Sequence, residues 1–148
     1  MQKQKIILLF EELLDTRISQ LQKLLDDLRE SAANETKSTA GDKYETALAM
    51  LQIEQDNARK QLQEAREQKS IFQSINWSLA SSIIKPGSLV QINKGWFLLG
   101  IAIGKIKTDN DNIISLSPQS PLGKKITGLK TGDETIVNGI TYTIQLIL

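Results

Sequence analysis

The chain has 148 residues, of which 40% are hydrophobic and 24% are charged, and its formal net charge is +1. It contains no cysteine and no histidine, which excludes disulfides, thiol nucleophiles, Cys/His zinc sites and imidazole acid–base catalysis. Any chemistry must therefore use carboxylates, lysines, hydroxyls or a metal ion held by oxygen ligands.

Neither of the two main apolar runs has the length of a targeting or membrane segment. Residues 6–10 form a run shorter than the roughly 7–15 apolar residues of a signal peptide and the roughly 20 of a membrane helix. The longest run, residues 96–104, is interrupted by glycine and is typical of a buried strand. We therefore expect a cytoplasmic protein with no membrane partner.

The composition changes near the middle of the chain. Residues 1–70 contain one glycine and no proline, whereas residues 71–148 contain the other eight glycines and all three prolines. The first part carries 11 Lys/Arg against 13 Asp/Glu, and the second carries 7 against 4. This change predicts two structural units. The predicted boundaries are 1–74 for a helical hairpin with its tip near 31–45, 75–85 for a linker and 86–148 for a sheet domain.

The first part is helical by its period. Apolar residues recur every seven positions at Ile7, Leu14, Leu21 and Leu28, with Glu, Gln, Lys and Asp on the outer positions. A second stripe follows, in which alanines alternate with larger residues; it comprises Tyr44, Ala47, Leu48, Leu51, Ala58, Leu62, Ala65 and Phe72. We expect two antiparallel helices, each about 40 Å long, paired as a coiled-coil hairpin.

The second part has the period of strands. The predicted strands are 88–93, 96–106, 112–117, 135–137 and 140–148. Asn138-Gly139 between the last two strands is the strongest short hairpin signal. Residues 120–128 predict one short helix, since Ser stands at the cap, Pro at the first helical position and Gly after the end. Alternate residues from Ile140 to Leu148 are predicted to share one face. The fold class is α+β, with a small antiparallel sheet and one short helix after the hairpin.

The segment from Ser117 to Glu134 resembles the C-terminal signature of the bacterial Gre-type transcription elongation (transcript cleavage) factors, the GreA/GreB family. It shares a serine–proline, a short helix, a glycine-containing turn and a Gly-Asp before a strand. The match continues through the Asn138-Gly139 hairpin, and Pro86–Val90 resembles the first strand of the same domain. The resemblance covers both halves of the chain in order.

This resemblance implies an FKBP-like sheet domain that docks on the rim of the secondary channel of RNA polymerase, and a coiled coil that enters the channel. It implies RNA polymerase as the partner, indirect contact with nascent RNA, an association with DNA binding and no small-molecule substrate. The chain would stimulate the polymerase's own transcript cleavage and would not itself be an enzyme. The residues implied in partner binding are Ser120, Pro121, Lys124, Lys125, Gly132 and Asp133.

At the predicted tip, residues 41–47 (Gly-Asp-Lys-Tyr-Glu-Thr-Ala) have the spacing of the family's acidic pattern. The resemblance implies that Asp42 and Glu45 form the catalytic, metal-binding pair, acting on a Mg²⁺ shared with the polymerase, with no cofactor bound by the chain alone. Residues three apart lie on one face of a helix. Alignment on Tyr44 instead places Glu35 near the first acidic position and Ser38 at the second, so that one acid remains.

Other interpretations of these residues stay open. Asp42 and Glu45 also fit the preference for acids in the first turn of a helix, where the dipole favours them. Lys124 and Lys125 either face an acidic partner or serve solubility. The alternative functions are a non-cleaving regulator in the same polymerase channel and a coiled-coil assembly protein that pairs with a second hairpin.

Overall fold

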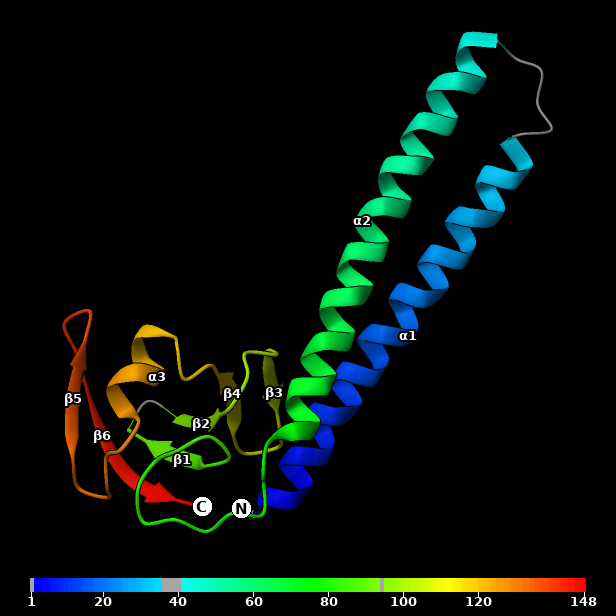
Figure 1. The fold of residues 1–148 in the computed structure, drawn as a ribbon. Coiled ribbons are helices and arrows are strands. Elements are labelled where there is room, and N and C mark those ends of the chain that lie inside the picture. The colour runs from blue at the N-terminus through cyan, green and yellow to red at the C-terminus, as the bar shows by residue number, and fades with distance from the viewer. Residues whose placement is uncertain (1, 36–40, 94) are drawn as a thin grey trace. The chain divides into compact units, whose positions relative to one another are not determined.

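The computed structural model describes residues 2–35, 41–93 and 95–148, with the backbone alone for residues 35 and 41–44. The elements in chain order are α1 (Lys3–Glu35), α2 (Gly41–Ser74), β1 (Leu89–Ile92), β2 (Gly95–Leu99), β3 (Lys105–Lys107), β4 (Asn112–Leu116), α3 (Pro121–Ile126), β5 (Glu134–Val137) and β6 (Ile140–Ile147) (Figure 1). The predicted α+β class is confirmed: a helical hairpin precedes a six-stranded sheet with one short helix. Contacts divide the chain into two compact units, Leu13–Lys69 and the combination of Met1–Glu12 with Ser70–Leu148.

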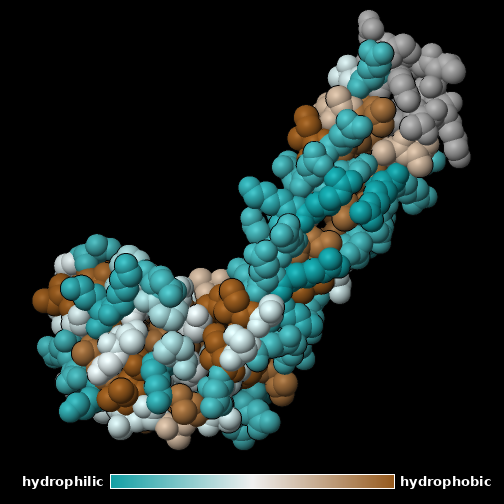
Figure 2. Space-filling model, in the orientation of Figure 1, coloured by the Kyte–Doolittle hydropathy of each residue, from teal (hydrophilic) through white to brown (hydrophobic). Residues whose placement is uncertain are grey.

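The Leu13–Lys69 unit is a pair of antiparallel helices held by a narrow apolar seam. Leucines of α1 face alanine and leucine of α2 in a buried cluster composed of Leu25, Leu28, Ala58 and Leu62. Polar side chains join the helices along the edges of the seam. The salt bridge from Lys69 Nζ to Asp15 Oδ1 measures 2.6 Å, and Arg66 donates to Gln22 Oε1 at 3.0 Å. Polar residues cover most of the visible hairpin surface (Figure 2).

Both helices are longer than the predicted 40 Å. α1 has 33 residues and α2 has 34, so each arm measures about 50 Å at 1.5 Å per residue. The extra length of α1 arises because this helix continues through residues 31–35, which lack an apolar period but include the helix-favouring pair Ala32-Ala33. One seam position is also polar: Gln55 is buried and donates to the backbone carbonyl of Leu28 at 3.4 Å.

The sheet has the strand order β3-β4-β2-β1-β6-β5. Its pairs are antiparallel except β2 with β4, which run parallel from Trp96↔Ile113 to Leu99↔Leu116. The predicted 138–139 turn is confirmed: Asn138 and Gly139 both have positive φ, 52° and 77°, as a type I′ hairpin turn requires. The sheet is mostly antiparallel, as the sequence predicted, and the parallel pair of β2 with β4 was not predicted.

The parallel pair follows from a break in the predicted strand 96–106. β2 ends at Leu99, and β3 begins only at Lys105. Between them the backbone N–H groups of Ile103 and Gly104 donate to the Ser115 hydroxyl at 2.6 and 2.9 Å. Backbone bonds from Gly100 N to the Leu116 carbonyl and from Ser115 N to the Gly104 carbonyl, both 2.9 Å, add to this anchor. Residues 100–104 are thus held against β4 outside the strands, and β3 then pairs antiparallel with β4.

The last strand contains a bulge that changes which residues are buried. Gln91 pairs with Leu146, but the next residue, Ile92, pairs with Ile144, leaving Gln145 as the extra residue. An extra residue shifts the alternation of side chains by one position. Ile144 is buried, whereas Leu146, which was predicted to share its face, is 42% exposed, and Ile147 packs against the core instead.

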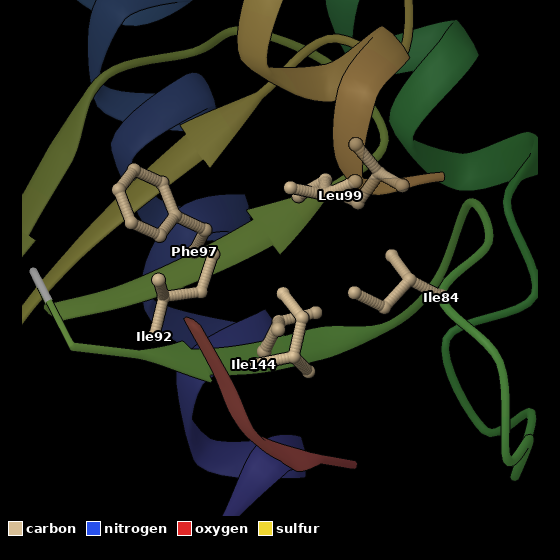
Figure 3. Packing of buried hydrophobic residues seen from close by; sticks show 7 residues of the cluster. Ile84, Ile92, Phe97, Leu99 and Ile144 are labelled. Carbon is tan, nitrogen blue, oxygen red and sulfur yellow. The ribbon is translucent and has the colours of Figure 1, made fainter. Parts of the chain in front are cut away.

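The core of the sheet unit is formed by side chains from β1, β2, β6, α3 and the segment before β1. It comprises Ile84, Val90, Ile92, Phe97, Leu99, Ile126 and Ile144. Figure 3 shows the labelled residues converging on one another. Ile84 belongs to this core although it precedes the first strand, and an isolated bridge pairs its neighbour Ile83 with Lys130. Among the described residues, no helix is long and apolar enough to cross a membrane.

Candidate functional site

The acidic pattern of the hairpin lies at the start of α2. The helix begins at Gly41, so Asp42 is its second residue and Glu45 follows three positions later. This spacing places the two residues on one face of the first turns of α2. The Glu45 side chain is exposed. The side chains of Asp42 and Glu35, and the whole of Ser38, lie outside the described residues, so the geometry of the acidic pair stays a prediction.

The donor chemistry at the start of α2 fits a hard divalent cation only in part. Carboxylate oxygens are the protein ligands that Mg²⁺ prefers, and Mg²⁺ usually takes one or two of them together with water and substrate oxygens. Within the described ranges, no group of three or more acidic side chains is placed to hold a metal ion.

The Ser120–Pro121 start of α3 has a clear structural role. Ser120 Oγ accepts a hydrogen bond from Gly123 N at 3.0 Å and donates one to the Ser117 carbonyl at 2.6 Å. Pro121 occupies the first helical position, where its missing N–H costs nothing. A side chain at Gly123 is excluded because a Cβ there would lie 2.0 Å from the Ser117 carbonyl oxygen. These residues set the shape of the surface that α3 presents.

Two lysines stand on the last turn of α3. Lys124 and Lys125 are both exposed, and neither makes an ion pair within the described part of the chain. Positive charge at the C-terminal end of a helix is favoured by the dipole, although α3 has only six residues. Their exposure makes these two lysines available to an acidic partner surface.

Gly132 and Asp133 form the turn that leads into β5, which packs beside α3. Gly132 has a φ of 94°, a conformation that glycine adopts at little cost. Its N–H donates to the Ile144 carbonyl at 2.8 Å. Asp133 Oδ2 accepts from Lys130 N at 2.9 Å. The structure thus brings the six predicted partner-binding residues together on neighbouring elements, and gives four of them a role in holding the local backbone.

Sequence reasoning did not single out Lys3 or the contact between Trp77 and Gly100. Lys3 Nζ donates to the Leu79 carbonyl at 3.2 Å, and partial burial lowers the pKa of Lys3. A signal was present, because Lys3 lies four residues before Ile7 and seven before Phe10, which places a charge on the apolar stripe of α1. Gly100 carries no comparable local signal.

The fold and the candidate site define an α+β class of protein with a helical hairpin followed by a sheet domain. Acidic residues lie in the first turns of the second hairpin helix, and the sheet domain contains one short, capped helix. No family model matches the sequence, and no curated protein matches it. Among solved structures, the chain is similar to one described as the structure of the transcription factor Gfh1, with 15% identity and a TM-score of 0.39. The similarity covers 93% of this chain and 92% of the other.

Proposed function

We propose that this chain is a Gre-like transcription elongation factor that binds RNA polymerase, inserts its coiled-coil tip into the secondary channel and stimulates cleavage of backtracked transcripts. The proposal is carried by one observation, the order of the elements. A hairpin of two long helices, with the Asp42/Glu45 spacing at the start of the second, precedes a sheet domain that contains the 117–134 signature. A cytoplasmic location, an association with DNA and indirect contact with nascent RNA belong to the same proposal.

The hairpin supplies what a rod entering a channel requires. Its buried seam is narrow, and its flanks carry polar cross-links such as Asp15–Lys69 and Gln22–Arg66. Its outer surface is mostly hydrophilic (Figure 2). The two arms brace each other through side chains from the Asp15–Lys69 pair to the Leu28–Gln55 contact, which stiffens the hairpin over that stretch.

The chemistry proposed for the tip needs only oxygen donors. Asp42 and Glu45 would hold a Mg²⁺ together with ligands of the polymerase, and a second divalent ion stabilises charge on the oxygens of a phosphodiester under attack. This chain's own contribution is two carboxylates on one helical face. In this proposal the polymerase supplies the remaining ligands of the ion, so the chain acts only when bound to the polymerase.

The sheet domain is the proposed dock. Lys124 and Lys125 are exposed without ion-pair partners in the described structure, so they are proposed to contact acidic side chains of the polymerase. Ser120, Pro121, Gly132 and Asp133 are proposed to act by positioning, since they cap α3 and fix the turn before β5.

The decisive experiment uses backtracked elongation complexes with labelled RNA. The wild type is compared with Asp42→Ala/Glu45→Ala at neutral pH in the presence of Mg²⁺. We expect the wild type to release short 3′ fragments and the double variant to lose at least about tenfold in cleavage rate, the scale of a charge contribution of 1.4 kcal/mol or more. Binding to polymerase on a sizing column should be unchanged, because both residues are remote in sequence from the dock.

Two control variants sharpen this test. Glu54→Ala removes an exposed acid from the same helix and should leave cleavage unchanged, whereas Glu35→Ala tests the other alignment of the tip. Binding without cleavage by the wild type would favour a non-cleaving regulator of the same channel. Absence of binding, together with a dimer in sedimentation at micromolar concentration, would favour a coiled-coil assembly protein.

A further inference from the structure

The apolar seam between the two hairpin helices is buried over only part of its length. The core positions of α2 recur at intervals of three and four residues, the spacing of a coiled coil. They are Leu48, Leu51, Gln55, Ala58, Leu62 and Ala65. The last three are between 2% and 4% exposed, whereas Leu48 and Leu51 are only half-buried. Burial along α2 therefore drops at Gln55, although the core residues before it are large and apolar.

Burial along α1 changes at the same level. Leu25 and Leu28 are buried, and the core position that follows them, Ala32, is half-buried and offers a single methyl group. Gln55 lies at this level, because its side-chain amide donates to the Leu28 carbonyl at 3.4 Å. Among the described residues beyond this contact, 29–34 of α1 and 45–54 of α2, none is buried. These two stretches are called the distal turns below.

Gln55 interrupts the seam with a polar group. It is 8% exposed, and its amide oxygen accepts a hydrogen bond from Arg59 at 3.1 Å. Its polar atoms thus bond to the backbone of α1 and to its own helix. A polar residue at a core position of a coiled coil costs stability. Because apolar burial is the main stabilising contribution of such a seam, that contribution weakens at Gln55.

The distal turns do not regain this burial elsewhere. They contain two further large apolar residues, Met50 and Ile53, which are 58% and 61% exposed. Most of the stability of a helix in a protein comes from packing of its apolar face, and short helical segments are marginal without it. The distal turns are therefore held mainly by their continuity with the rest of α1 and α2.

From this drop in burial we propose that the hairpin contains a conformational switch: the distal turns open and close as a unit of their own, and Gln55 sets the boundary of that unit. In the open state the two arms separate beyond the Leu28–Gln55 contact, while the buried cluster of the hairpin stays packed. Opening exposes no side chain that is buried in the described distal turns, so it occurs far more often than unfolding of the whole Leu13–Lys69 unit. A partner that contacts the closed form would shift the population toward it. The inference rests on packing alone and does not depend on the proposed function.

Amide hydrogen exchange of the full chain, resolved by residue, tests the proposal. After correction for intrinsic rates, we expect the amides of residues 47–53 to exchange at least about a hundredfold faster than those of residues 58–65. The rates within 47–53 should be similar to one another, with a step at Gln55, because one opening event exposes all of them. Simple fraying from the helix end predicts instead a gradual decline in rate from residue 47 to residue 65. A gradual decline, or equal rates on both sides of Gln55, would overturn the proposal.

Gln55→Leu tests the boundary, because it completes the apolar seam between Leu51 and Ala58. Burial of the added leucine should slow the exchange of residues 47–53 about tenfold relative to residues 58–65. Gln52→Leu is the matched control, since Gln52 is exposed in the same turns and the same substitution changes helix propensity little. It should leave the ratio of the two rates unchanged.

Two results with these variants would overturn the role given to Gln55. One is an unchanged ratio of rates in Gln55→Leu, and the other is an equal change in Gln52→Leu. The comparison of rates on the two sides of Gln55 in the wild type needs no variant, so the test stands even where Gln55→Leu fails to fold.

Discussion

Trp77 is held by contacts with two separate stretches of sequence, at Phe72 and at Gly100. Its indole N–H donates to the Phe72 carbonyl, its ring is tilted by 38° against the Phe72 ring, and its Cη2 edge lies beside Gly100. Gly100 is therefore a packing glycine. It has no positive φ in the structure, so the space above its Cα, and not the backbone conformation, is what excludes a side chain there.

Gly100→Ala should destabilise the protein by about 1–3 kcal/mol, the usual cost of overpacking. The added Cβ would lie 2.6 Å from a Trp77 ring atom and 2.9 Å from Ile75 Cδ1, and the indole cannot yield without losing its hydrogen bond. Urea unfolding followed by circular dichroism measures the change. In a Trp77→Ala background the same substitution should cost clearly less, because only the contact with the flexible end of Ile75 remains and alanine restricts the unfolded chain. If Gly100→Ala destabilises the protein equally in both backgrounds, the contact with Trp77 is not the cause of the destabilisation.

Among the elements, those governed by neighbouring residues were predicted best from the sequence. The capping serine, proline and following glycine predicted α3, and Asn138-Gly139 predicted the turn between β5 and β6, because each signal lies inside the element that it controls. The heptad spacing predicted the paired helices for the same reason. The break after β2 was missed, since it depends on Ser115, eleven or twelve residues away along the chain.

The bulge and the candidate site also depend on residues that are distant in sequence, and the sequence predicted them less well. Alternation along β6 predicted that Leu146 shares a face with Ile144, but the extra residue Gln145 in the pairing with β1 leaves Leu146 exposed and Ile144 buried. Sequence spacing put Asp42 and Glu45 on one helical face, yet the choice between this pair and the Glu35 alignment needs a partner's contacts. Lys3 was overlooked because its environment comes from residues 75–82, which are distant in sequence.

Two variants of α3 test its contribution to stability and its proposed role in binding separately. Ser120→Ala removes both the cap on Gly123 N and the bond to the Ser117 carbonyl, and should lower the free energy of unfolding by about 1 kcal/mol. Lys124→Glu/Lys125→Glu changes exposed charges only, so thermal unfolding should shift little while polymerase binding weakens. Calorimetry and a binding titration on both variants check this. If the charge-reversal variant binds as well as the wild type, the two lysines do not contribute to the proposed contact with the polymerase.

At the scale of the whole molecule, the two units have separate buried clusters. One cluster, in the Leu13–Lys69 unit, contains residues of α1 and α2, and one in the other unit contains residues from Ile84 onward; that unit also buries Ile6, Phe10 and Phe72. Since hydrophobic burial is the main stabilising contribution in each unit, a cavity in one cluster should open that unit without opening the other.

Leu62→Ala is the corresponding test. Leu62 is 4% exposed in the hairpin seam, and its truncation should cost about 2–4 kcal/mol. Amide hydrogen exchange should accelerate across α1 and α2 in the Leu13–Lys69 unit, while protection in β1, β2 and β6 stays within experimental error. Faster exchange in those strands to the same degree would indicate a single cooperative unit.

The position of β1 in the sheet sets the order in which the chain can fold as it is synthesised. β1 lies between β2 and β6, and Leu89 and Leu148 exchange backbone hydrogen bonds at 2.9 and 2.7 Å. The sheet core is therefore incomplete until the last strand has left the ribosome, whereas the hairpin, built from contacts between adjacent helices, can form much earlier. A nascent chain halted before β6 would carry a folded rod and an open strand edge on β1, the kind of surface that chaperones cover.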